Sequence, residues 1–564
     1  MTNRPDQNRQ IVTGDAEGEV LAFVEGISFW GGIDPDSGRI IDIHHPNNGQ
    51  SVAGKVLLMP TSRGSCSGSG VLLQLALDGN APAALVFCER EEVLTLGALV
   101  AGRVFGHPVP VLRLGRETYG ALAAAPDAVL AGGCLRFVDR SIPLAKVQAQ
   151  DLDLTDADRA VLAGASGEAA QMAMEVLCQM AASDGAKALT PVTRGHIDGC
   201  ILAHSANLIF AEKMADLGAR VVVPTTINAI SVDRENWPSQ GIAAEFGARA
   251  SRLADAYVRM GAKPTFTCAP YLLADAPKEG EVIGWSESNA VIFANTVLGA
   301  RTPKHPDYLD LFIAMTGRAP ATGVYTDEGR LARVEIRVQA PQGLDDLFWP
   351  LLGWLVGKHA PDRIPLVTGL EEIPASRDDL KAMCAAFGTT SGAPMLHVAG
   401  HTPEADRCRD PDAPTVTLGR NDFRAAWEEL NQGETKVDVV AIGSPHSSLE
   451  EVRRVVDLFG TRRCAAETQM IVTLGRDVLR AAAREGQVVR LQAAGVRLIP
   501  DLCWCSVTEP VFPPHAQGLL TNSGKYAHYA HGLSGRHARL ASLTDCVAAA
   551  VSGQAPTKPP DWLA

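Results

Sequence analysis

Apolar runs of strand length recur along the chain and alternate with polar loops and amphipathic segments. In the first 140 residues, runs at 56–59, 84–87 and 110–114 predict strands. Residues 71–75 have the composition of a helix that begins soon after the first of these runs. Paired strands are expected at 20–24 and 28–30, and another strand at 38–43. The mixture predicts a compact α/β domain at the amino end.

From about residue 190 the pattern becomes a repeated order of helix, glycine and strand. A helix is expected over 208–217, Gly218 ends it, and residues 219–223 then form a buried strand. The same order returns at 378–398 and at 491–499. This repetition predicts a multi-lobed α/β region with parallel-type sheets.

A polar stretch rich in aspartate, residues 148–159, lies between the two patterns. We place a domain boundary beside it, with a small domain at 1–145 and a large region at 146–564 that holds more than one α/β lobe. The linker is short, so the two parts are expected to pack together.

Four polar motifs follow apolar strands at their carboxyl ends. They are residues 224–228, 400–404, 443–446 and 501–505. Open α/β sheets build their sites at this edge, so the four motifs are expected to converge on one cleft.

The most unusual stretch of the first domain is Pro60–Gly70, which is rich in glycine and serine and follows an apolar strand. Its glycines let backbone approach a ligand, and Arg63 can bind a carboxylate through two parallel hydrogen bonds. We interpret it as an anion site; a serine-rich helix cap without chemistry is the alternative. The glycine spacing fits neither common nucleotide-binding fingerprint.

Three cysteines lie in irregular segments of the large region. Cys503 and Cys505 flank a tryptophan, and Cys268 stands in a stretch broken by two prolines. Singly, each is more often a buried thiol than a metal ligand. Together they suggest an iron–sulfur cluster, because such clusters are held by thiolates. Structural zinc is a weaker alternative, since the spacing is not that of paired C-x₂-C motifs.

Two further segments concentrate polar side chains. Residues 285–289 lead into a helix that reaches Asn295, with Arg301 beyond it. Thr521–Tyr526 resembles a phosphate loop, but its first glycine is displaced, so no nucleotide site is expected there. Lys525 can still bind a carboxylate; a solvated loop lysine is the alternative.

Composition narrows the classes of function. The chain has 564 residues, of which 46% are hydrophobic and 20% charged, so it is globular. Its net charge of -13 has no basic stripe, which argues against nucleic acid or an anionic membrane and favours a small-molecule ligand. No apolar run reaches membrane-spanning length, and the amino terminus lacks the apolar core of a signal peptide, so a cytoplasmic protein with reduced cysteines is expected.

Taken together, these stretches resemble the aconitase X family, a branch of the aconitase superfamily, over nearly the whole chain. Residues 10–140 look like its small swivelling domain, with Arg63, Gly64 and Ser65 as the signature. Residues 150–555 look like its large subunit. The matching motifs are His196–Gly199, Val223–Asn228, Cys268–Leu273, Trp285–Ser288, Asn295–Arg301 and Asn522–Lys525.

One departure from the family pattern concerns the cluster. Two-chain members carry Gly-Cys-Pro-His where this chain has Ser444 in place of the cysteine, and a further cysteine where it has Phe266. A three-cysteine cubane is therefore in doubt, and the resemblance to fused members implies a [2Fe-2S] centre. Cys268 and Cys503 match family ligands by position, and Cys505 is the candidate replacement.

The resemblance implies a hydro-lyase that dehydrates a small hydroxy amino acid, cis-3-hydroxy-L-proline, to Δ¹-pyrroline-2-carboxylate. In this reading Ser65 is the base at the α-carbon, Arg63 orients the carboxylate, and the cluster draws on the departing hydroxyl as a Lewis acid. The expected substrate-binding residues are Ser67, Thr225, Asn228, Ser288, Asn295, Arg301 and Lys525. A monomer or small homo-oligomer is expected.

Other functions remain open from the sequence. Within the same superfamily the alternatives are mevalonate 5-phosphate dehydratase and another hydroxy-acid dehydratase or isomerase. A nicotinamide enzyme would need a glycine fingerprint after a first strand, which is not found. A non-catalytic metal-storing or interaction protein would keep the cysteines without needing Ser65 and Arg63.

Overall fold

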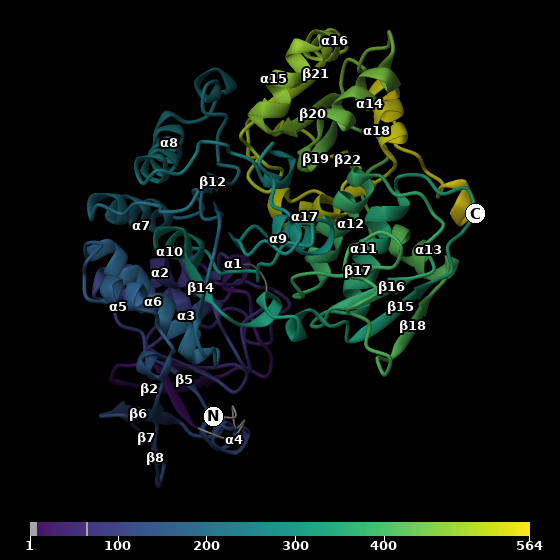
Figure 1. Ribbon diagram of the computed structural model, residues 1–564. Coiled ribbons are helices and arrows are strands. Elements are labelled where there is room, and N and C mark those ends of the chain that lie inside the picture. Colours follow the sequence, from purple (N-terminus) through teal and green to yellow (C-terminus); the bar gives the residue numbers. More distant parts are fainter. Residues whose placement is uncertain (1–7, 64–65) are drawn as a thin grey trace. The chain divides into compact units, whose positions relative to one another are not determined.

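The computed structural model describes residues 8–63 and 66–564, which form two compact units (Figure 1). Unit 1 comprises the described part of Met1–Thr225 together with Ala256–Ala262 and His305–Thr322. Unit 2 comprises Thr226–Asp255, Lys263–Lys304 and Gly323–Ala564. The boundary expected near residue 145 lies inside unit 1, and the small-domain limits stay a prediction.

Unit 1 contains a sheet of nine described strands in the order β8-β7-β6-β2-β3-β4-β5-β1-β9. Its strands are β1 Arg9–Val12, β2 Ala16–Ala22, β3 Val56–Leu58, β4 Ala84–Phe87, β5 Val111–Arg113, β6 Asp127–Ala131, β7 Cys134–Phe137, β8 Arg140–Pro143 and β9 Ala145–Lys146. The central strands β2 to β5 pair in parallel, and β6, β7 and β8 continue the sheet in antiparallel pairs. The strands expected at 56–59, 84–87 and 110–114 are confirmed.

Helices and short strands complete unit 1. They are α1 Phe29–Gly32, α2 Gly68–Leu77, α3 Val93–Phe105, α4 Arg116–Ala123, α5 Asp156–Leu162, α6 Glu168–Ser183, α7 Ser205–Asp216, α10 Leu309–Thr316, β10 Leu189–Pro191, β11 Gly195–Ile197 and β14 Arg318–Pro320. Helices α2 and α3 are buried over most of their length, which explains why α2 has no polar face. The helix expected from residue 71 is confirmed.

Three strand predictions in unit 1 are wrong. Residues 38–43 form only isolated bridges, from Ile40 to Ile33 and from Arg39 to Ser51. Residues 28–30 begin the short helix α1, where Ile33 N–H donates to the Phe29 carbonyl at 3.2 Å, and Gly31 takes a positive φ of 74° that a strand does not allow. In residues 219–223, Val221 N–H donates to the Met260 carbonyl and Val222 N–H to the Ala314 carbonyl, and neither bond belongs to a strand ladder. Val222 is 65% exposed, so this apolar run is not a buried strand.

Unit 2 contains two parallel sheets, as the repeated helix–glycine–strand order predicts. One has the order β17-β16-β15-β18 and the other β21-β20-β19-β22-β23. Their strands are β15 Val334–Val338, β16 Pro365–Thr368, β17 His397–Val398, β18 Thr415–Leu418, β19 Val439–Ser447, β20 Gln469–Leu474, β21 Val496–Pro500, β22 Leu519–Thr521 and β23 Ala538–Leu540. The expected α/β class with parallel sheets is confirmed.

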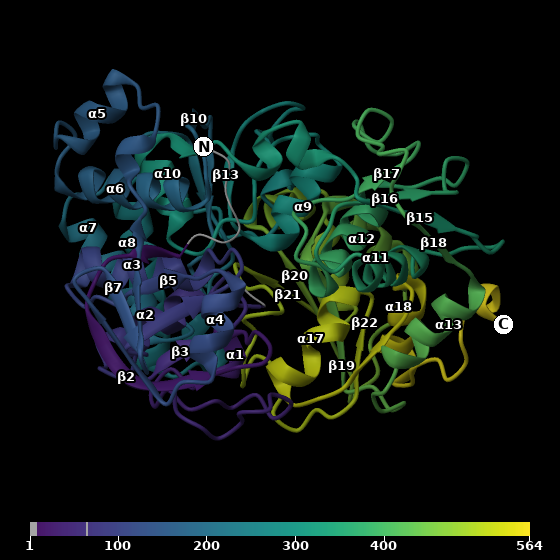
Figure 2. The same ribbon diagram turned by 90° about the horizontal axis from the view of Figure 1, so that it is seen from below.

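The helices of unit 2 are α9 Ser288–Thr296, α11 Phe348–His359, α12 Arg377–Thr390, α13 Arg420–Glu429, α14 Leu449–Phe459, α15 Arg476–Arg484, α16 Gln487–Ala493, α17 Gly524–Ser534 and α18 Leu543–Ser552. The short strand β13 Gly284–Trp285 precedes α9, while β12 Thr225–Ile227 and α8 Ala244–Arg259 run across the unit limits. Helices α11 and α12 lie side by side in both ribbon views (Figures 1 and 2).

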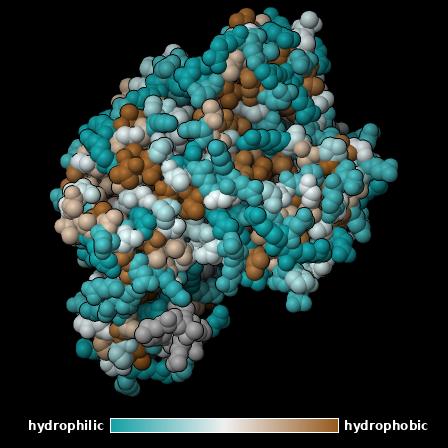
Figure 3. Space-filling model, in the orientation of Figure 1, coloured by the Kyte–Doolittle hydropathy of each residue, from teal (hydrophilic) through white to brown (hydrophobic). Residues whose placement is uncertain are grey.

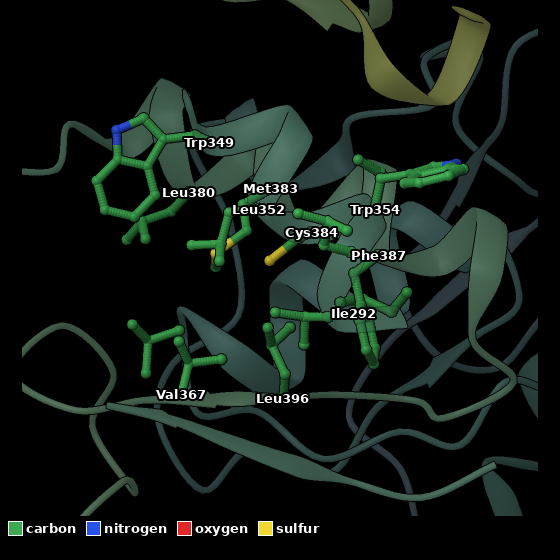
Figure 4. Packing of buried hydrophobic residues seen from close by; sticks show 14 of the residues in the cluster. Ile292, Trp349, Leu352, Trp354, Val367, Leu380, Met383, Cys384, Phe387 and Leu396 are labelled. Carbon is green, nitrogen blue, oxygen red and sulfur yellow. The ribbon is translucent and has the colours of Figure 1, made fainter. Parts of the chain in front are cut away.

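The core of the first sheet of unit 2 forms where α11 and α12 pack over it. Trp349 and Leu352 of α11 face Met383 and Cys384 of α12, above Val367 of β16 (Figure 4). These side chains are all buried, so the sheet and both helices share one apolar interior. On the surface, hydrophilic side chains dominate the face seen in Figure 3, and apolar ones form scattered groups. Among the described residues, no helix is long and apolar enough to cross a membrane.

A buried ion pair lies beside this core. Arg330 and Glu404 are 1% and 3% exposed, and Arg330 Nε donates to Glu404 Oε2 at 2.8 Å. Glu404 belongs to the 400–404 motif, which follows β17 of the first sheet. Its carboxylate also accepts a hydrogen bond from Arg407 at 2.8 Å. The 400–404 motif therefore contributes Glu404 to the buried ion pair with Arg330 and does not contribute it to the cysteine group.

We expect Glu404→Gln to lower the free energy of unfolding by about 3–5 kcal/mol, because it leaves the Arg330 guanidinium buried without its anion. Chemical denaturation of the purified protein measures this change. Glu279→Gln is the control, since the Arg407–Glu279 pair is more than half exposed and should contribute about 1 kcal/mol or less. Equal effects of the two substitutions would contradict the structural role of Glu404.

Candidate functional site

Three of the four expected polar motifs meet in unit 2. Cys268 and Cys503 are buried together with Ala229, and Cys505 packs against them. An isolated β-bridge between Ile230 and Leu502 joins the segment after β12 to the segment after β21. The 443–446 motif contacts both cysteine segments through His446. These segments therefore lie together, and that they form one binding site stays a prediction.

The 400–404 motif is the exception, and its place in the shared cleft is corrected. It follows β17, which belongs to the β17-β16-β15-β18 sheet, whereas the 443–446 and 501–505 motifs belong to β19 and β21 of the other sheet. The carboxyl ends of strands meet at one edge only within a single sheet, so the segment after β17 does not have to lie beside the segments after β19 and β21. Glu404 instead completes the buried pair with Arg330.

The three thiols form a contiguous sulfur group. A hydrogen bond with Cys268 raises the pKa of the Cys503 thiol, and burial adds to that rise. A hydrogen bond with Cys503, together with burial, raises the pKa of Cys505 well above its usual value. Burial therefore opposes the thiolate forms of Cys503 and Cys505, and a bound cation would have to offset that cost.

A bulge in β19 carries the 443–446 segment out of the regular sheet. The register shifts between Ile442 and Ser447, so the four residues 443–446 of β19 lie opposite the single residue Thr473 of β20. Gly443 has φ 99°, and a Cβ there would lie 2.1 Å from the Thr473 carbonyl oxygen, so only glycine fits. The bulge leads to His446, whose backbone N–H donates to Cys268 Sγ at 3.3 Å.

Lys525 provides the positive charge near the sulfur group. It lies at the start of α17, and its Nζ donates to Glu287 Oε1 at 3.0 Å. Burial alone would lower its pKa, but Glu287 and the three cysteines outweigh burial and raise it well above the usual value. The alternative of a solvated loop lysine is wrong, since the side chain is 11% exposed.

Glu287 organises the polar side chains around Lys525. Its carboxylate accepts hydrogen bonds from Asn228 Nδ2 at 3.0 Å and from the Asn289 side chain. Burial would raise the pKa of Glu287, but Lys525 and these amide donors bring it to about 2. Ser288 follows at the first position of α9. Asn228 and Lys525, both predicted from the sequence, therefore bind one carboxylate, and Ser288 is the next residue in the chain after Glu287.

Two other predicted residues of unit 2 have different surroundings. The Asn295 amide donates to the carbonyls of Thr302 and Pro394, and its oxygen accepts from Thr302 N–H and from Arg330. Arg301 donates to the Tyr325 carbonyl at 3.0 Å and pairs with Asp327. These contacts join α9, the 301–302 segment and the Arg330 pair.

The predicted residues of unit 1 are described separately. Ser65 lies outside the described residues. Arg63 is 60% exposed at its side chain, and its NH1 lies 3.1 Å from Glu25 Oε2. Ser67 stands at the start of α2, where its carbonyl accepts from Gly70 N–H at 3.1 Å. Thr225 is buried and donates to the Val223 carbonyl at 2.8 Å.

Unit 1 also brings together a thiol and two carboxylates. Cys66, Asp198 and Asp307 place one ligand atom each within 4.8 Å of one another, and they are the one such group among the described residues. Cys66 Sγ lies 3.4 Å from Asp198 Oδ2.

Sequence reasoning missed two residues of the site. Glu287 lies in the 285–289 segment, which was selected for its serines and asparagine. The one sequence signal for its ion pair was Lys525, which lies far along the chain. Thr267 directly precedes Cys268, and its hydroxyl lies 3.0 Å from His446 Nδ1. Neither contact has a local sequence signal, because each joins residues more than 170 positions apart.

Family models cover most of the chain. Those described as the aconitase X swivel, first, second and third domains match residues 6–168, 151–328, 332–428 and 437–552.

Full-length relatives and a solved structure extend this likeness. The chain is 48% identical to "Cis-3-hydroxy-L-proline dehydratase" of Pseudomonas aeruginosa over 98% of both chains. It is 44% identical to a protein of the same name from Hypocrea jecorina, over 98% of this chain and 96% of that one. The crystal structure of holo-form aconitase X from Thermococcus kodakaraensis matches with a TM-score of 0.65 at 30% identity, covering 72% of this chain and 100% of that one.

Proposed function

The chain belongs to the aconitase X family, and we propose that it is a hydro-lyase that dehydrates cis-3-hydroxy-L-proline to Δ¹-pyrroline-2-carboxylate. The observation that carries this proposal is the identity of 48% and 44%, over essentially the whole length, to two proteins named for that dehydration. The phosphomevalonate dehydratase large subunits of Thermococcus kodakarensis and Methanothermobacter thermautotrophicus are each 32% identical to this chain. Their matches cover 67% and 66% of it.

The donor set in unit 2 fits an iron–sulfur cluster. Cys268, Cys503 and Cys505 would hold it, with thiolate sulfur as the ligand that such clusters require. Lys525 would offset part of the negative charge of the thiolates. When bound, the cluster would supply a Lewis acid for the substrate hydroxyl. We propose the [2Fe-2S] type, because Ser444 and Phe266 stand where two-chain members have cysteines.

The substrate is proposed to bind beside the sulfur group through the polar side chains around Glu287. Lys525 has three N–H donors and gives one to Glu287, so its others are free to bind the substrate carboxylate. Glu287, Asn228 and Asn289 hold the ammonium group of Lys525 in place through the shared carboxylate. Ser288 offers a hydroxyl at the amino end of α9, where backbone N–H groups favour an anion.

Ser65 is the proposed base. Removal of the α-proton and departure of the 3-hydroxyl as water leave a carbon–carbon double bond next to the ring nitrogen, and this enamine tautomerises to the cyclic imine. A serine hydroxyl is too weak a base unless its alkoxide is stabilised, which is the role we assign to Arg63 and nearby backbone N–H groups. Arg63 is exposed and shares its guanidinium with Glu25, so it is accessible to a substrate carboxylate.

A substrate panel tests the proposal. The purified protein, reconstituted anaerobically with iron and sulfide, is offered cis-3-hydroxy-L-proline, trans-3-hydroxy-L-proline and mevalonate 5-phosphate. The imine from the amino acids and the unsaturated acid from the phosphorylated substrate are each quantified. We expect turnover of the cis amino acid alone. Turnover of the phosphorylated acid alone would replace our assignment with the alternative from the same family.

Lys525→Met should weaken binding of the amino acid. A hydrogen bond to a charged group contributes about 1.5–3 kcal/mol, so KM should rise roughly tenfold to a hundredfold. Steady-state kinetics and iron content are measured together. Lys358→Met is the control, because Lys358 pairs with Glu429 at the surface of the same unit. An unchanged KM in a variant that retains its iron would contradict the carboxylate-binding role.

A further inference from the structure

His446 occupies the position between the two cysteine segments of unit 2. It is 1% exposed, and its Nε2 lies 2.6 Å from the Leu502 carbonyl oxygen. Its Nδ1 lies 3.0 Å from the Thr267 hydroxyl oxygen. Leu502 directly precedes Cys503, and Thr267 directly precedes Cys268. The imidazole ring therefore contacts the residue before each of two buried cysteines.

The partners determine which ring nitrogen carries the proton. A carbonyl oxygen only accepts, so Nε2 of the neutral ring is the donor to Leu502. Nδ1 then accepts from the Thr267 hydroxyl, whose oxygen also accepts from Ala269 N–H at 3.1 Å. Both nitrogens are used by these neighbours. His446 is thus unsuited to bind a metal directly, yet well placed to determine the separation of the two segments.

The backbone of His446 is anchored from behind by a buried charged group. Lys381 of α12 is 3% exposed, and its Nζ lies 3.4 Å from the His446 carbonyl oxygen. Lys381 also pairs with Asp378 at 3.1 Å and with Glu451, whose carboxylate accepts from Ser448 N–H in the cap of α14. The histidine is therefore held by two helices while its ring and its N–H reach the cysteine segments.

We propose that His446 is a positioning residue that joins the Cys268 and Cys503 segments into one preformed ligand site. It does so through three hydrogen bonds, to Thr267, Leu502 and the sulfur of Cys268. This inference rests on one part of the proposed function, namely that the cysteine thiols bind the cluster. Metal ligands that are held in place by such outer contacts bind their metal more tightly. Loss of these contacts lowers the metal affinity roughly tenfold to a hundredfold.

The test compares His446→Phe with a matched control, His397→Phe. His397 is also 1% exposed, and its Nε2 lies 2.7 Å from the Arg330 carbonyl oxygen, in the other sheet of the same unit. Phenylalanine keeps a planar ring but has no ring nitrogen. For each holoprotein, the rate of iron release to an excess of chelator, the visible circular dichroism and the unfolding midpoint are recorded.

We expect His446→Phe to release iron roughly ten to a hundred times faster than wild type and to change the visible spectrum. His397→Phe should lower the unfolding midpoint without either effect. Thr267→Val removes only the hydroxyl partner, so it should accelerate iron release by a smaller factor. This variant should fold even if His446→Phe does not.

Two results would overturn the proposal. Iron release at the wild-type rate in both His446→Phe and Thr267→Val removes the positioning role, and so does equal acceleration in His397→Phe, which would reflect general destabilisation. A wild-type protein that takes up no iron is a separate failure: it refutes the cluster of the proposed function and the role of His446 with it.

Discussion

Cys503→Ser is expected to abolish the visible absorption of the reconstituted protein, together with its turnover. The sulfur of Cys503 contacts those of both Cys268 and Cys505, so its loss removes the middle member of the group. The loss of iron affinity on removing a direct ligand should exceed the roughly tenfold to hundredfold loss on removing an outer contact. Cys268→Ser should behave in the same way, because its sulfur also receives the N–H of His446.

Visible spectroscopy and iron and sulfide assays on the same preparations measure this effect. Cys546→Ala is the matched control: Cys546 is fully buried in the core of the second sheet of unit 2, so its substitution should cost about 1 kcal/mol of stability and no iron. Full absorbance and iron content in both Cys268→Ser and Cys503→Ser would show that these cysteines are not the ligands.

Ser65→Ala should lower turnover by roughly a hundredfold to ten-thousandfold, the usual contribution of a general base. The substitution deletes only a hydroxyl, so the iron content and the KM of the amino acid should change little. Arg63→Lys keeps the positive charge but loses the planar pair of donors, so its main effect should be weaker substrate binding. The contrast between the two variants separates proton removal from carboxylate binding.

Exchange of the substrate α-hydrogen with deuterated water isolates the step assigned to Ser65. Under conditions in which wild type exchanges this hydrogen, Ser65→Ala should exchange it far more slowly. Ser141→Ala is a suitable control, since Ser141 lies in an exposed edge strand of unit 1. Exchange at the wild-type rate in Ser65→Ala would assign the base to another residue.

Local sequence signals predicted many of the elements correctly. The capping box at the start of α14, Ser448 with Glu451, is a signal of this kind, because it needs contacts only between residues three apart. The buried strands β3 and β4 were likewise recognisable, since strands covered on both faces are continuously apolar. The prolines placed Cys268 in an irregular segment and the 501–505 motif placed Cys503 after a strand, and the two residues lie together in the structure.

The sequence by itself determined the α/β class and the parallel sheets of unit 2 and singled out the three cysteines that the fold brings together, because periodicity, glycine stops and residue chemistry are local properties. Only the tertiary structure decided that the 400–404 motif serves a buried ion pair, that Glu287 is the partner of Lys525, and that His446 lies between two cysteine segments. These outcomes depend on which sheet a strand joins and on contacts between distant residues. A buried charge or imidazole needs a partner, but its sequence does not say which distant residue the fold brings to it.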